Sequence, residues 1–180
     1  VVASVYAQKE SVIVQLDKID KLIVYNGLHV NLIQSEEQKL EITGERAEEI
    51  QVRQKKGTLK ISLDLMNTFG TQKVTINLYY NSNIAEIDAN QGAVIRSKGV
   101  FKQTQLSVNT QEGAYIKLNL DVDYLKAKGI TGGHFQLKGK NLEFSWPGNN
   151  LTAITDSNKS RSRTRTRSNN RNAQLLNEWV

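Results

Sequence analysis

Short runs in which apolar and polar residues alternate extend from residue 11 to residue 144. Clear examples lie at 22–25, 28–32, 40–42, 59–63 and 74–79, where Val, Ile, Leu and Tyr alternate with polar residues. This period of two is typical of β-strands with one buried face. Residues 45–49 could form at most one helical turn, and Lys-Lys-Gly-Thr at 55–58 fits a hairpin loop between two strands. The pattern predicts an all-β fold.

Glycines recur at a regular spacing in the second half of the chain. Gly92, Gly113 and Gly133 are 21 and 20 residues apart, and each lies between two strand-like segments. A period of about 20 residues predicts a single-chain β-solenoid, in which short strands of successive rungs stack about 4.8 Å apart. A glycine at the same place in each rung would allow a sharp turn. The alternative is a β-sandwich with frequent turns, in which the glycine spacing has no structural meaning.

Three segments resemble a known bacterial family. Leu-Asp-Lys-Ile-Asp-Lys-Leu-Ile-Val at 16–24, Gly-Leu-His-Val-Asn-Leu-Ile-Gln at 27–34 and Gly-Thr-Leu-Lys-Ile at 57–61 are similar to the "putative auto-transporter adhesin, head GIN domain" family. The repeated Gly-Ala segments resemble it too, and the resemblance covers about residues 16–145. It implies an extracytoplasmic β-solenoid of a kind common in Bacteroidetes, with an adhesin role and no catalytic residues to carry over. Family members usually continue with further glycine-containing rungs, and this chain departs from that pattern at about Trp146.

Positive charge is concentrated at the end of the chain. The 180 residues carry 24 Lys and Arg against 18 Asp and Glu, a net charge of +6. Residues 157–180 contribute six basic residues and one acid, whereas residues 1–156 contain 18 basic and 17 acidic residues. Nucleic-acid binding by the nearly neutral body is therefore not expected. The six basic residues of the tail are Lys159, Arg161, Arg163, Arg165, Arg167 and Arg171.

Both ends differ from the alternating body. Val5 and Ala7 fit the −3 and −1 positions of a signal-peptidase site, which predicts that residues 1–7 are the remnant of a signal peptide and that the protein acts outside the cytoplasm. Residues 8–145 then form the β-solenoid domain. Residues 146–180 form a basic tail that we expect to be disordered, because the run from Ser157 to Ser168 has no apolar residue.

Two other interpretations of this tail remain. It could be an arginine-rich arm that binds anionic polymers. It could also result from a shifted reading frame, because a neighbouring frame of Ser-Arg-Ser codons can encode Lys-Val, which would continue the strand pattern.

Candidate chemistry is sparse, and the sequence assigns no catalytic, cofactor-binding or metal-binding residue. There is no cysteine, and no apolar run approaches the roughly 18 residues that a membrane helix needs. Asp121 and Asp123 would share one face of a strand, which could mimic the site of a polysaccharide-active β-helix, although such pairs usually face solvent. His29 and His134 are the two histidines, and we expect His29 to face solvent. The tyrosines (Tyr25, Tyr79, Tyr80, Tyr115 and Tyr124) are expected to pack in the core or at edges rather than to form a sugar-stacking ladder.

The sequence thus favours a non-enzymatic, extracytoplasmic module that is adhesin-like or structural and needs no cofactor. It would present a repetitive polar surface to a polysaccharide or another cell-surface polymer, and an exposed final rung would favour self-association. One alternative is a polysaccharide-active β-helix enzyme that uses Asp121 and Asp123. The other is binding of an anionic polymer through the arginine-rich tail.

Overall fold

Strands make up most of the described part of the chain, which confirms the all-β prediction. The computed structural model describes residues 11–63, 74–140, 144–145, 151–156 and 174–178, and its side chains up to Gly139. Within these residues one 3₁₀ turn, η1 (Ala47–Glu49), interrupts the strands, inside the segment for which a single helical turn was expected. The strands are β1 (Ser11–Gln15), β2 (Lys21–Val24), β3 (His29–Gln34), β4 (Lys39–Thr43), β5 (Ile50–Lys55), β6 (Thr58–Leu63), β7 (Thr75–Tyr80), β8 (Glu86–Ala89), β9 (Val94–Thr110), β10 (Tyr115–Gly129), β11 (His134–Lys140), β12 (Phe144–Ser145), β13 (Leu151–Asp156) and β14 (Gln174–Glu178).

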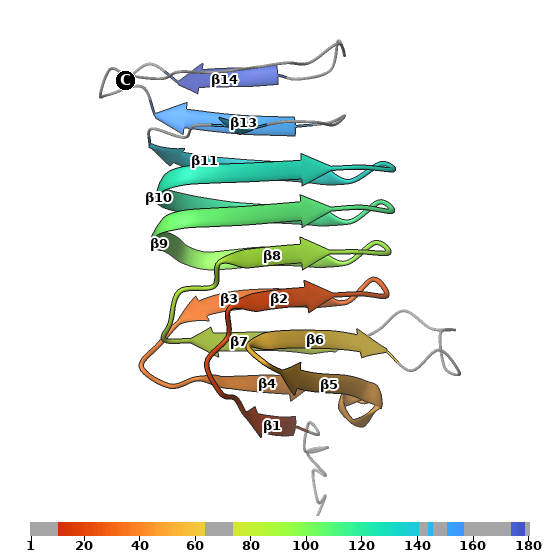
Figure 1. The fold of residues 1–180 in the computed structure, drawn as a ribbon. Helices are drawn as coiled ribbons and strands as arrows, with labels where there is room; N and C mark the ends of the chain where they lie inside the picture. The colour runs from red at the N-terminus through yellow and green to blue at the C-terminus, as the bar shows by residue number, and fades with distance from the viewer. Residues whose placement is uncertain (1–10, 64–73, 141–143, 146–150, 157–173, 179–180) are drawn as a thin grey trace, which may run out of the picture.

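Most strands stack in parallel and in register, in two series that face each other across the core (Figure 1). The first series, here called the front face, runs β6, β2, β8, the second half of β9 and the second half of β10. The second series, the back face, runs β7, β3, the first half of β9, the first half of β10 and β11. Because β9 and β10 bend from one face to the other, the two series belong to one curled sheet.

Four tight turns connect the two faces at one edge of the molecule and stack on each other. Each pairs a residue with glycine, and both residues have positive φ, as in Asn26 (57°) and Gly27 (66°). This conformation is that of a type I′ turn, which favours glycine at its second central position. The glycine N–H donates to the carbonyl of the next turn along the stack, over 2.8 Å from Gly27 to Gln91 and 2.9 Å from Gly92 to Glu112. The other three turns are Gln91-Gly92, Glu112-Gly113 and Thr131-Gly132.

The stack corrects one assignment made from the sequence. Gly132, not Gly133, occupies the turn position of Gly92 and Gly113, with a φ of 79°. The spacing in the stack is therefore 21 and then 19 residues, as in the pairs Val94 with Tyr115 and Tyr115 with His134. The Asn26-Gly27 turn joins the same stack although it lies far earlier in the chain.

Gly133 occupies a position where no side chain fits. A Cβ atom built there would lie 2.4 Å from the Thr110 Oγ1 atom and 2.6 Å from the Thr110 carbonyl oxygen. In the other turns this position holds Leu28, Ala93 and Ala114, all buried. The side chains at this corner of the core thus shrink along the stack until only glycine can be accommodated.

Alternation along each strand sends one set of side chains into a single core. In β2 and β8 the inward residues are Leu22, Val24, Ile87 and Ala89, all with 0% exposure. In-register pairing places equivalent residues above one another, so each inward position forms a column that runs along the stack. Since the apolar face of one strand cannot exclude water by itself, the columns become a core only when the strands are stacked.

The N-terminal end of the stack is finished by antiparallel strands. On the back face β4 pairs with β7, and β1 pairs with β4. On the front face β5 pairs with β6 through the expected hairpin at Lys56-Gly57, whose φ values are 47° and 75°. Ala47 of η1 and Ile50 of β5 are buried at this end and contribute to the core.

The segment 146–180 contains two of the strands. β13 pairs in parallel with β11, and β14 pairs in parallel with β13. The arginine-rich run and the expected signal-peptide remnant both lie outside the described residues. The domain boundaries at residues 7 and 145 remain predictions.

We expect Gly133→Ala to lower the free energy of unfolding by about 1–3 kcal/mol, because the added methyl group overlaps the Thr110 backbone, which cannot rotate away. Gly99→Ala is the matched control, since a Cβ atom there meets nothing within 4 Å. Urea unfolding followed by circular dichroism measures both. Equal stability of the two variants would contradict this account of Gly133.

Thr110 has a buried hydroxyl group that, among the described residues, finds no hydrogen-bond partner. We expect Thr110→Val to raise the free energy of unfolding by about 1 kcal/mol, because it removes an unpaired polar atom and keeps the shape. The opposite substitution at a neighbouring buried position, Val108→Thr, should lower the free energy of unfolding by about 1–3 kcal/mol. Thermal and urea unfolding of both variants provide the test, and a destabilised Thr110→Val would show that the hydroxyl supports the fold.

Candidate functional site

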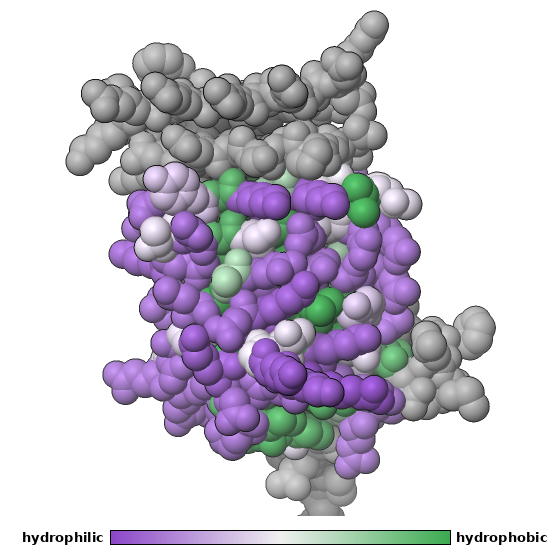
Figure 2. All heavy atoms as spheres, in the orientation of Figure 1, coloured by the Kyte–Doolittle hydropathy of each residue, from purple (hydrophilic) through white to green (hydrophobic). Residues whose placement is uncertain are grey.

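The outward positions of the stacked strands form broad polar surfaces. Figure 2 shows the front face, which is mainly hydrophilic with small apolar patches between the polar side chains. Register places Lys21 beside Glu86 and Ile23 beside Asp88, and the Lys21 Nζ atom lies 3.0 Å from the Glu86 Oε1 atom. Partial burial raises the pKa of the Asp88 carboxyl, and a hydrogen bond from Asn90 partly offsets this effect.

A chain of hydrogen-bonded polar side chains crosses the back face. Asn31 donates to Asn77 over 3.0 Å, and Asn77 donates to Glu41 over 3.3 Å. Tyr79 also donates to Glu41, over 3.1 Å. These side chains come from β3, β7 and β4, and the in-register pairing of those strands is what brings them together. Their hydrogen bonds orient this part of the face, where the Lys39 Nζ atom also lies 5.3 Å from the centre of the Tyr79 ring.

The same back-face row continues into a group of cations. Asn31 pairs with Arg96, and Arg96 pairs with Lys117. His29 lies on β3 and its side chain faces solvent, as expected. Partial burial of the imidazole and, secondarily, the charge of Arg96 lower the pKa of His29. Residues 94–140 carry eight basic and three acidic residues. The near neutrality of the body is therefore an average over regions with different charge.

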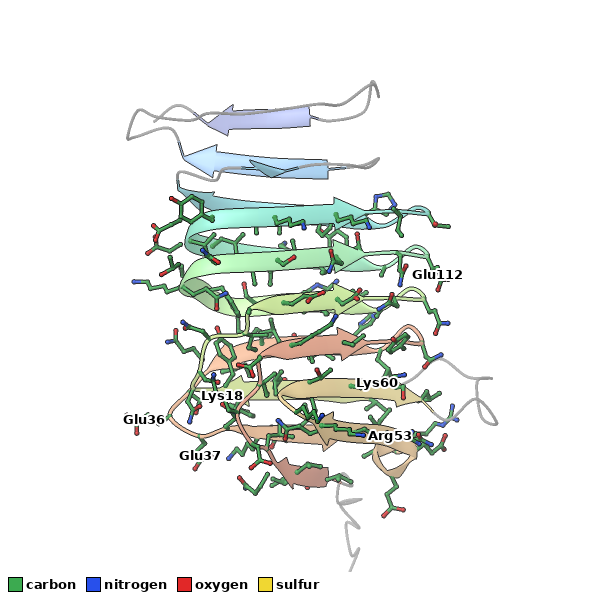
Figure 3. All side chains as sticks on the ribbon, in the orientation of Figure 1. Lys18, Glu36, Glu37, Arg53, Lys60 and Glu112 are labelled. Atoms are coloured by element: carbon green, nitrogen blue, oxygen red, sulfur yellow. The ribbon has the colours of Figure 1, made fainter. Side chains whose placement is uncertain are left out.

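The front face has a hollow of about 450 Å³ at its N-terminal end, where β5 and β6 approach the first turn of the stack. Arg53 and Lys60 lie directly opposite each other in the antiparallel β5–β6 pair, and both are exposed (Figure 3). The Lys60 Nζ atom lies 4.5 Å from the centre of the Tyr25 ring. Arg53 donates from Nη2 to the Gln51 Oε1 atom over 3.1 Å. The hollow is lined by Tyr25, Asn26, Gln51, Arg53, Lys60, Ser62, Leu63 and Gln91.

The sequence did not single out this hollow. Arg53 and Lys60 are visible in the sequence as cations at equal distances from the 55–58 hairpin loop, so their cross-strand pairing could have been deduced. Tyr25 could not have been added, because its proximity depends on parallel pairing between β2 and β6.

Asp121 and Asp123, the pair considered for polysaccharide chemistry, lie on the outer side of β10. Both carboxylates are exposed, and the Asp121 Oδ2 atom lies 3.9 Å from the Lys102 Nζ atom. Exposed carboxylates with at most a loose ion pair are common on the solvent-facing side of a strand. No observation on the described residues favours catalysis at this pair.

The remaining candidate side chains do not form a common site. His29 and His134 are exposed on different strands, and no group of three His, Cys, Asp or Glu in the described residues could hold a metal ion. Tyr80 is buried, with its ring centre 5.2 Å from that of Phe101, and burial raises its pKa to about 12. Tyr124 is 57% exposed, whereas Tyr115 donates to Gln136 over 2.6 Å. The tyrosines thus occupy different surroundings and form no ladder.

The described residues contain no helix that is both long enough and apolar enough to cross a membrane.

Solved structures of two bacterial proteins have a similar fold. A protein from Bacteroides fragilis described as a putative adhesin superimposes with a TM-score of 0.64 at 15% identity, covering 83% of this chain and 85% of that one. A protein from Parabacteroides distasonis described as a putative lipid binding protein has a TM-score of 0.58 at 12% identity, with 84% and 72% covered. At such low identity these similarities show the fold alone.

No curated protein matches the sequence. A family model does match, over residues 18–155, and its description is "putative auto-transporter adhesin, head GIN domain". This match agrees with the resemblance carried by residues 16–145 and spans most of the chain. The protein therefore belongs to the family described as "putative auto-transporter adhesin, head GIN domain".

Proposed function

We propose that this protein is an extracytoplasmic, non-enzymatic adhesin-like module built as a β-solenoid. Membership of the adhesin family supports the role. The parallel, in-register stack of rungs supports the solenoid, because a β-sandwich of two antiparallel sheets would not pair β8, β9 and β10 in this way.

The observation that carries the proposal is the repetition of outward polar positions along the stack. On the front face Glu86 pairs with Ser107, and Ser107 pairs with Lys126. Neighbouring strands lie about 4.8 Å apart, so each row offers polar groups at close and regular intervals. An extended polymer lying along the stack could contact several rungs at once.

Many such contacts give avidity without a deep pocket. Each contact to an exposed polar group is weak, but contacts made by one polymer reinforce each other because the second is already held near its site. We propose a polysaccharide or another cell-surface polymer as the partner. The cations of residues 94–140, Arg96 and Lys117 among them, would favour acidic polymers over neutral ones.

Self-association through a strand edge is part of the same proposal. β1 pairs with β4 on one side, and within the described residues no strand pairs with its other side. Ile13 in the middle of β1 is 57% exposed. An open edge with an exposed apolar residue favours contact with another strand.

The test is binding of the full chain to immobilised polygalacturonate, dextran sulfate, mannan and dextran, measured by biolayer interferometry. We expect an acidic polymer to be retained, with an apparent affinity at least 10-fold tighter for the polymer than for its trimer. Binding should weaken as salt is raised, because exposed charges are screened. Failure to bind any of the polymers, or equal affinity for trimer and polymer, would contradict the proposal.

A further inference from the structure

We propose that the hollow between β5, β6 and Tyr25 is a binding site for one acidic sugar unit of the polymer, bound through its carboxylate or sulfate group. The inference rests on the proposed function, because it assigns the ligand class of one place on the polymer-binding surface. It goes beyond that function by predicting a preformed binding site for a short ligand.

The first argument is the uncompensated charge of the hollow. Like charges directly opposite each other on antiparallel strands destabilise a sheet, and Arg53 and Lys60 are such a pair. The ion pairs between described residues do not include either one. Higher on the same face a carboxylate lies beside a lysine, as Glu86 is beside Lys21. A bound anion would turn the repulsion between Arg53 and Lys60 into attraction.

The second argument is that both cations are positioned by neutral groups. The Tyr25 ring holds the Lys60 ammonium by a cation–π contact of 4.5 Å. The Gln51 amide oxygen accepts one N–H of Arg53 at 3.1 Å. These partners restrict the side chains without cancelling their charge. The guanidinium keeps further N–H donors in the planar arrangement that fits a carboxylate or a sulfate.

The third argument is the shape and the polar lining. About 450 Å³ lies within the range of roughly 300–1,000 Å³ typical of small-ligand pockets. Ser62 and Gln91 add a hydroxyl and an amide at the wall, and these groups can exchange hydrogen bonds with sugar hydroxyls. Asn26 is already engaged, because its Oδ1 atom accepts from Leu63 over 3.3 Å and its Nδ2 atom donates to Gln91 over 3.0 Å. Those two hydrogen bonds fix the edge of the hollow where the Asn26-Gly27 turn meets β6.

The acidic side chains labelled in Figure 3 lie away from the hollow. Glu36 and Glu37 are on the connection between β3 and β4, and Glu112 is in a turn of the stack. Glu37 is already paired with Lys39. An acidic ligand therefore meets cations in the hollow and carboxylates at the edges, which would favour one position for its charged group.

The experiment compares short ligands by isothermal titration calorimetry on the full chain. The probes are trigalacturonate, its methyl ester and a sulfated galactose trimer. We expect one or both acidic trimers to bind, and the neutral ester to bind at least 10-fold more weakly. The acidic trimer that binds identifies whether a carboxylate or a sulfate is recognised.

Arg53→Gln with Lys60→Gln removes both charges and keeps polar side chains of similar length. We expect this double variant to lose at least 10-fold in affinity for the acidic trimer. The matched control is Lys55→Gln with Lys56→Gln, which removes the same charge from exposed positions at the β5–β6 hairpin that do not line the hollow. The control should stay within about 2-fold of the wild type. The single variants Arg53→Gln and Lys60→Gln, each expected to lose several-fold, keep the test decisive if the double variant does not fold.

Three results would overturn the site. They are equal binding of the neutral ester, equal losses in the hollow and control variants, and unchanged binding in the hollow variant. If polygalacturonate is still retained in any of these cases, the site is wrong and the proposed function stands. If the trimer binds in the hollow and the polymer is bound no more tightly, the site stands and the proposed function is wrong.

Discussion

The parallel, in-register backbone ladder is the interaction on which the rest of this structure depends. Neighbouring strands exchange hydrogen bonds along the stack, with one register shift between β9 and β10, and the tight turns continue the ladder through bonds such as that from Gly92 to Glu112. Register then decides which side chains are neighbours. It builds the core columns from Leu22 and Ile87, the polar chain from Asn31 and Asn77, and the adjacent cations Arg96 and Lys117. A shift of one residue in any strand would exchange its buried and exposed faces.

Local features of the sequence could be predicted because they depend on neighbouring residues. Alternation of apolar and polar residues predicted strands, and Lys56-Gly57 predicted the β5–β6 hairpin, since positive φ favours glycine. The turn glycines were recognised at 92 and 113, but Gly133 was chosen in place of Gly132. The residues that follow could have decided between the two glycines, because the buried Ile95, Ile116 and Phe135 lie three residues after Gly92, Gly113 and Gly132. What the sequence could not show is that Thr110 lies opposite Gly133 in the folded chain.

Features that depend on distant segments could not be predicted. No pattern in the sequence says that the Asn26-Gly27 turn stacks on Gln91-Gly92, because 65 residues separate them. The hollow has the same origin, since it needs both the local β5–β6 hairpin and the placement of β2 beside β6. The charge of the body was considered only as a sum over residues 1–156. Its sum is near zero, but the structure places Arg96 beside Lys117 with a net excess of cations around them.

The position of β2 has a consequence for how the chain must fold. Both of its partners, β6 and β8, follow it in the sequence, so the first strand of the front face ends up in the interior of the ladder. The closure of long loops must precede these contacts, and its entropic cost slows folding. During synthesis β2 stays without partners until the ribosome has released residue 63 at least, and its second edge stays open until residue 89. Each later strand at the C-terminal end, by contrast, pairs with one already in place. We therefore expect the order of assembly to run from a slow nonlocal nucleus to rapid sequential addition.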